Sequence, residues 1–143
     1  MSAKGIRDID VIRTFVLQGT LNFTRYFFKI RQKRKFVIGK HHREIAAALD
    51  KVLCGEITRL IINIAPRYGK TELAVKNFIA EGLAINPKAK FIHLSYSDDL
   101  ARDNSRGVQD IINEPEYRRI FPATIPTCLL YTSPSPRDGL LSR

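Results

Sequence analysis

The stretch Ile61-Ile62-Asn63-Ile64-Ala65-Pro66-Arg67-Tyr68-Gly69-Lys70-Thr71-Glu72 determines the fold that this sequence predicts. A run of apolar residues ends at Pro66, a short loop follows, and a helical pattern begins at Gly69-Lys70-Thr71. A strand, a glycine-containing loop and a helix in this order are typical of a phosphate-binding loop, where backbone N–H groups and the positive end of the helix face the phosphates. The other interpretation is an ordinary turn that carries an exposed lysine.

The chemistry of phosphate binding gives each residue of this loop a role. Lys70 would reach the β- and γ-phosphates of a nucleotide, and the Thr71 hydroxyl would bind Mg²⁺. Gly69 has no Cβ and would let the backbone approach the anion closely. The motif is incomplete, because the pattern G-x-x-x-x-G-K-[ST] asks for a glycine where this chain has Ile64.

Length and composition limit the class of protein. The 143 residues are enough for one domain or part of one. The sequence has no apolar run of about 18 residues and no signal-peptide layout, so we expect an intracellular protein. Cys54 and Cys128 make no disulfide framework, and with three scattered histidines they do not predict a zinc site.

The net charge is +10, from 24 basic and 14 acidic residues, and the excess is uneven. A basic segment without any acidic residue comprises Arg25, Lys29, Arg31, Lys33, Arg34, Lys35, Lys40 and Arg43. A polyanion such as nucleic acid would suit this segment. A solvated basic face explains the same charges equally well.

Apolar residues at helical spacing predict helices over residues 8–17, 22–30 and 41–53. Asn22 is the expected cap of the second helix. Aromatic residues of this helix, Phe23 and Phe27 among them, alternate with basic ones, which could suit stacking on nucleic-acid bases. Their helical spacing favours packing in the core.

Two apolar runs predict buried strands over Ile57–Ile64 and Lys90–Ser95. A helix is expected after each of them, one from about Lys70 to Ile85 and one capped by Ser97. The order β, phosphate loop, α, β, α predicts an α/β fold in which a parallel sheet has right-handed crossovers.

The character of the sequence changes after Phe121-Pro122. Residues 128–143 have no periodicity, are rich in Ser and Pro, and resemble a translated sequencing adapter, so we exclude them from the fold prediction. The predicted organisation is an N-terminal helical basic segment over 1–40, a partial P-loop ATPase domain over 41–127, and a disordered tail of non-native appearance over 128–143.

Residues Ala65–Glu72 resemble the Walker A motif Pro-Pro-Arg-His/Tyr-Gly-Lys-Ser/Thr-Glu of the large terminase subunits of tailed bacteriophages, the motors that package viral DNA. The resemblance extends over about residues 20–125. The other matching stretches are His41-His42-Arg43, Gly55–Asn63, Asn86-Pro87, Ser95–Ala101, Asn104-Ser105-Arg106, Tyr117 and Phe121-Pro122.

The resemblance implies a P-loop NTPase with a RecA-like parallel sheet flanked by helices, of which this chain would hold the N-terminal helices and the first two core strands. It implies ATP and Mg²⁺ as cofactors, and a nuclease domain in the full-length protein. The implied partners are double-stranded viral DNA, the portal protein and the terminase small subunit. It also implies a homo-oligomer on the portal, in the host cytoplasm and without a membrane.

The Walker B strand and the catalytic Glu of such proteins lie beyond Thr127. We therefore expect this fragment to bind nucleotide without turning it over. In a RecA-like sheet, moreover, Ile57–Ile64 and Lys90–Ser95 are not neighbours. We expect these two strands to leave unpaired backbone groups or to pair with each other in a non-native way.

The resemblance implies a cofactor-binding set consisting of Pro66, Arg67, Tyr68, Gly69, Lys70, Thr71 and His42. Lys70 and Arg67 would be catalytic, with Arg67 stabilising charge on the γ-phosphoryl group in the transition state. Arg67 precedes Lys70 by three residues, whereas many large terminases have a spacing of four, so a ground-state phosphate contact is the alternative. His42 stands where related motors carry an adenine-reading glutamine; a surface histidine at a helix start is the other interpretation.

Two further classes of protein compete with the packaging motor. One is a helicase-type or other P-loop NTPase. The other is a non-catalytic nucleic-acid-binding module in which the basic segment is the functional part.

Overall fold

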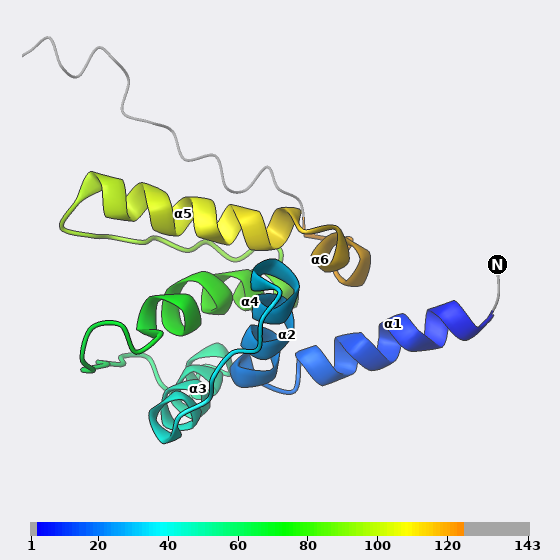
Figure 1. Cartoon of the computed structure of the whole chain (residues 1–143), viewed down its shortest axis with the longest axis horizontal. Coiled ribbons are helices and arrows are strands. Elements are labelled where there is room, and N and C mark those ends of the chain that lie inside the picture. The colour runs from blue at the N-terminus through cyan, green and yellow to red at the C-terminus, as the bar shows by residue number, and fades with distance from the viewer. Residues whose placement is uncertain (1–2, 125–143) are drawn as a thin grey trace, which may run out of the picture.

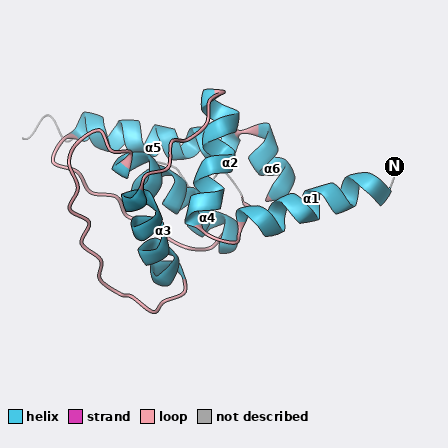
Figure 2. Cartoon of the chain, turned by 60° about the horizontal axis from the view of Figure 1, so that its bottom comes forward, coloured by secondary structure: helices cyan, strands magenta, loops and turns pink. Residues whose placement is uncertain are grey.

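The computed structural model describes residues 3–124 as an arrangement of helices joined by loops (Figure 1). The predicted tail over 128–143 lies outside these residues. In chain order, the helices are α1 (Ala3–Val16), α2 (Thr20–Gln32), α3 (Lys40–Leu53), the π-helix η1 (Glu72–Asn77), α4 (Phe78–Ile85), α5 (Asp98–Asn113) and α6 (Pro115–Ile120). Figure 2 shows no strand among residues 3–124.

The predicted α/β fold, with its RecA-like parallel sheet, is therefore wrong for the described part of the chain, which is all-α. Ile57–Ile64 and Lys90–Ser95 have no regular secondary structure. Among the described residues, no backbone hydrogen bond joins residues 58–64 or 90–95 to each other or to another segment. The physical reason is that a strand must pair its N–H and C=O groups with a neighbouring strand, and no described segment supplies one.

Apolar side chains of these two segments are exposed instead of buried in a sheet. The exposed fractions are 85 % for Ile61, 88 % for Ile92 and 86 % for Leu94. Phe91 is only partly covered: it packs over Gly82 of α4, where an added Cβ would lie 2.4 Å from the ring. Both segments therefore direct apolar groups to solvent, and the second also contacts α4 through Phe91.

The predicted helices in the N-terminal half are confirmed, although α2 begins at Thr20, before the expected cap Asn22. The helix expected from Lys70 to Ile85 is present, but its first part is the π-helix η1. The core lies between α2, α4, α5 and α6, and α1 contributes to it at its C-terminal end. Its buried apolar side chains are Val16, Phe23, Phe27, Ala80, Leu83, Val108, Ile111, Ile112, Tyr117, Ile120 and Phe121.

An aromatic cluster holds α2 against α4 and α6. The ring centroids of Phe23 and Phe27 are 4.6 Å apart, and those of Phe27 and Tyr117 are 5.4 Å apart. The buried Tyr117 hydroxyl donates to the Ala80 carbonyl oxygen over 2.8 Å, and burial raises the pKa of Tyr117 to about 12. The core interpretation of Phe23 and Phe27 is therefore confirmed.

A buried carboxyl group lies where α4 meets α2. Glu81 is 1 % exposed. Burial raises the pKa of Glu81 to about 7, and nearby Asp50 contributes to the increase. Thr20 holds Asp50, because its backbone N–H and its hydroxyl donate to Asp50 Oδ1 over 2.8 and 2.7 Å.

Glu81 should make the stability of the fold depend on pH. Between pH 4.5, the ordinary pKa of Glu, and about 7, the folded state keeps the proton that the unfolded state has lost, so the free energy of unfolding falls as pH rises. In the wild type, the free energy of unfolding should decrease by up to about 3 kcal/mol across this range, and Glu81→Gln should abolish this decrease. Urea unfolding at several pH values measures it. Glu44→Gln, at an exposed site on α3, is the control. The same pH slope in Glu81→Gln and the wild type would contradict this assignment.

Candidate phosphate-binding site

Residues 65–71, here called the 65–71 loop, lead from the irregular segment into η1. The helical conformation begins at Lys70. The side chains of Lys70 and Thr71 are exposed, and Tyr68 is 53 % exposed. The Leu73 N–H donates to the Gly69 carbonyl oxygen over 3.0 Å and closes the first turn. The loop therefore presents a lysine and a threonine at the positive end of a helix.

Two residues of the loop have left-handed backbone conformations. The φ angle is +68° at Arg67 and +71° at Gly69. The N–H groups of Arg67, Tyr68 and Gly69 donate no hydrogen bond to any described residue. Backbone N–H groups without partners beside a helix start are the kind of donors that bind phosphate oxygens.

His42 joins the start of α3 to the 65–71 loop, with one ring nitrogen bonded to each. Its Nδ1 accepts a hydrogen bond from the Gly39 N–H over 2.9 Å, so its proton is on Nε2. Nε2 then donates to the Tyr68 carbonyl oxygen, also over 2.9 Å. Burial lowers the pKa of His42, the Tyr68 hydrogen bond raises it, and His41 lowers it. The net decrease favours the neutral ring that both hydrogen bonds require.

Aromatic rings surround this connection. The ring of Phe36 packs edge-on against His42 at 4.9 Å between centroids, and Phe28 of α2 packs against Phe36 at 5.1 Å. On the other side, His41 packs against Tyr68 at 5.5 Å. The imidazole of His42 is only 7 % exposed, so its orientation is fixed by neighbours in α2, α3 and the loop.

Glu72, which directly follows Thr71, is held by partners from two helices. Arg31 of α2 contacts Glu72 Oε1 over 2.8 Å, and the two side chains are only 11 % and 17 % exposed. Within η1, Lys76 lies 3.8 Å from Glu72 Oε2, and the Asn77 amide donates to the Glu72 carbonyl oxygen over 2.7 Å. This network attaches the start of η1 to α2.

The structure thus brings the sequence-predicted residues Pro66 to Thr71 into one exposed loop and places His42 beneath it. Among the described residues, no ion pair involves Arg67 or Lys70, so both cations are available to an anion. The sequence analysis did not identify Arg31 as a partner of Glu72. Nothing in the sequence indicates a contact between residues 41 positions apart.

The residues of the loop fit a nucleotide with its magnesium ion by the chemistry of their donors. The N–H groups and the Lys70 ammonium suit phosphate oxygens, and the Thr71 hydroxyl is an oxygen ligand of the kind that Mg²⁺ takes. No group of three or more His, Cys, Asp or Glu side chains in residues 3–124 could hold a metal ion. Phosphate oxygens of the nucleotide would therefore be ligands of the ion together with the Thr71 hydroxyl.

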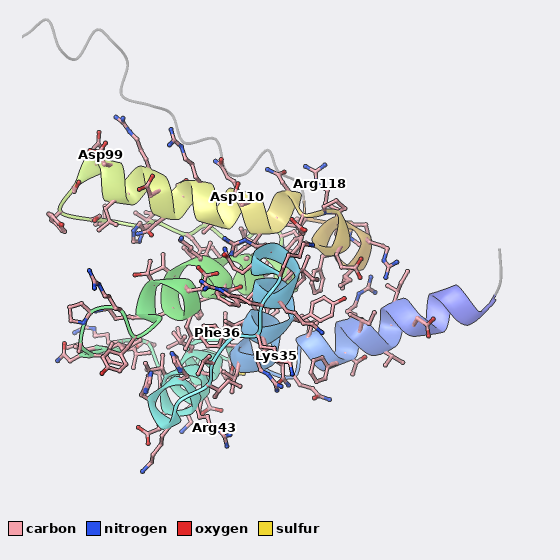
Figure 3. All side chains as sticks on the ribbon, viewed as in Figure 1. Lys35, Phe36, Arg43, Asp99, Asp110 and Arg118 are labelled. Carbon is pink, nitrogen blue, oxygen red and sulfur yellow. The ribbon has the colours of Figure 1, made fainter. Side chains whose placement is uncertain are left out.

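A second candidate surface is the basic segment. Seven of its eight basic side chains are exposed, and Arg31 is the exception because it pairs with Glu72. Arg34 lies over the Phe28 ring, 5.8 Å from the centroid. Figure 3 shows Lys35 beside α2 and Arg43 at α3, away from Asp99 and Asp110 on α5. The seven exposed basic side chains therefore lie on α2, on α3 and in the loop between them.

Comparison with protein-family models, with curated proteins and with solved structures finds no match to this chain. In the described part of the chain, every helix is too short or too polar to cross a bilayer.

Two glycines with positive φ permit a matched test of the loop geometry. Gly69 and Gly55 have φ angles of +71° and +79°. An alanine in this conformation costs about 1–2 kcal/mol. A Cβ at Gly69 would also lie 3.0 Å from His42 Nε2, whereas a Cβ at Gly55 would have no described neighbour within 4 Å. Urea unfolding should therefore show a larger loss of stability for Gly69→Ala than for Gly55→Ala. Equal losses would mean that Gly69 and His42 are not in close contact.

Proposed function

We propose that this chain binds the phosphates of ATP, with Mg²⁺, at the 65–71 loop. The observation that carries the proposal is the position of Gly69-Lys70-Thr71 at a helix start. Among residues 3–124, the exposed lysine has no ion pair and the N–H groups before it have no partner. Lys70 would contact the β- and γ-phosphates, and Thr71 would bind the ion. Arg67 would contact the γ-phosphate.

We further propose that the chain is part of the ATPase motor of a phage terminase large subunit, which packages viral DNA. The Walker A-like sequence supports this proposal, and the basic segment would suit the DNA. Hydrolysis of ATP, the nuclease, the portal and small-subunit partners, assembly on the portal and location in the host cytoplasm are proposed for the full-length motor.

Lys70→Ala should weaken binding of Mg·ATP about tenfold or more, because a hydrogen bond to a charged group contributes about 1.5–3 kcal/mol. Isothermal titration calorimetry measures the affinity. Lys51→Ala, which removes an exposed lysine at the end of α3, is the matched control. Thr71→Ala should reduce the gain in ATP affinity that Mg²⁺ provides, and it should leave the affinity for ATP without Mg²⁺ unchanged. Equal affinities of Lys70→Ala and the wild type would rule out this site.

A second candidate function is binding of nucleic acid without catalysis. The observation that favours it is the exposure of seven basic side chains between Arg25 and Arg43. Each phosphate contact by a lysine or arginine releases a counterion, so binding would weaken steeply with salt.

Neutralising Lys33, Arg34 and Lys35 to glutamine tests this candidate. The logarithm of the affinity for double-stranded DNA falls linearly with the logarithm of the salt concentration. The slope of this line should become less steep by up to about three, because each lost phosphate contact lowers it by about one. The matched control replaces Lys88, Lys90 and Arg106, which are also exposed, and removes the same net charge. Fluorescence anisotropy over a range of salt concentrations measures both slopes. Equal slopes for the two triple variants would mean that the basic segment is only a solvated face.

A further inference from the structure

The peptide bond between Tyr68 and Gly69 has its orientation set by His42. The His42 Nε2–H donates to the Tyr68 carbonyl oxygen over 2.9 Å, so this oxygen points to the protein interior. The described chain has no cis peptide bond. In a planar trans peptide, the C=O and the following N–H point in opposite directions. The Gly69 N–H therefore points away from His42, toward the exposed side of the loop.

From this geometry we propose that His42 is a positioning residue, which turns the Gly69 N–H toward the side of the 65–71 loop where phosphate binds. The proposal rests on the proposed nucleotide site for the identity of the ligand. This role differs from recognition of the adenine base, which a glutamine performs at the matching position of related motors. Both ring nitrogens of His42 already have protein partners, and the residue is only 7 % exposed.

The surroundings of His42 provide the rigidity that a positioning residue needs. The Gly39 N–H determines which nitrogen carries the proton, and the Phe36 ring restricts rotation of the imidazole. Gly69 has no Cβ, and an added one would lie 3.0 Å from His42 Nε2 and 3.5 Å from Phe36 Cζ. The imidazole thus reaches the loop backbone directly, and a displacement of the ring would be transmitted to the peptide.

The test compares the wild type with His42→Ala and His42→Gln, using inorganic pyrophosphate and triple-resonance NMR of the backbone amide and carbonyl groups. Alanine removes the donor to Tyr68, whereas the glutamine amide can replace it. Without ligand, His42→Ala should shift the carbonyl ¹³C signal of Tyr68, which responds mainly to the hydrogen bond that this oxygen accepts. It should also weaken pyrophosphate binding about tenfold, the effect of one lost hydrogen bond. His42→Gln should restore both. His93→Ala, whose ring is bonded to Asn104 on α5, is the matched control and should change neither.

The ligand-free spectra separate this proposal from the proposed function. If the wild type binds neither pyrophosphate nor Mg·ATP, the proposed function is wrong, but signal shifts in His42→Ala that His42→Gln reverses still support positioning by His42. An unchanged Tyr68 carbonyl signal in His42→Ala overturns the positioning role, whatever the affinity. If His42→Ala does not fold, the ring ¹⁵N shifts of the wild type decide, because a proton on Nδ1 instead of Nε2 is incompatible with the Gly39 hydrogen bond.

Discussion

Burial of the aromatic face of α2 is the constraint on which the rest of the structure depends. Phe23 and Phe27 pack with Tyr117, whose hydroxyl reaches the backbone of α4. With one face of α2 held in this way, Arg31 reaches the start of η1 and Glu72. The chain after α2 then returns along Phe36 to the start of α3, where His42 contacts the loop. The candidate site is thus a consequence of how a single helix packs.

The sequence predicts the helices well and the sheet incorrectly, for one physical reason. A helix satisfies its hydrogen bonds within its own segment, so the spacing of residues such as Phe23 and Phe27 is enough to identify it. A strand needs partners that a local pattern does not reveal. The apolar run around Ile61 and the one around Ile92 show the composition of buried strands, but neither segment has a pairing partner among the described residues.

For the candidate site, the sequence locates the loop but does not show what holds it. Gly69-Lys70-Thr71 stands at a helix start, as the motif predicts. The contacts of His42 and the ion pair between Arg31 and Glu72 join residues 26 and 41 positions apart, and no residue spacing indicates them. The sequence analysis also did not predict the π-helical turn, in which the Asn77 side chain donates to the Glu72 carbonyl oxygen.

The unpaired apolar segments have a consequence for the behaviour of the protein at high concentration. Exposed side chains such as Ile92 and Leu94 lie next to backbone groups that have no partner within the described part of the chain. Such a surface is of the kind through which chains associate and aggregate. The net charge of +10 opposes such association by mutual repulsion. Salt screens the repulsion but leaves the apolar attraction intact. We therefore expect the colloidal stability of this protein to decrease as ionic strength rises.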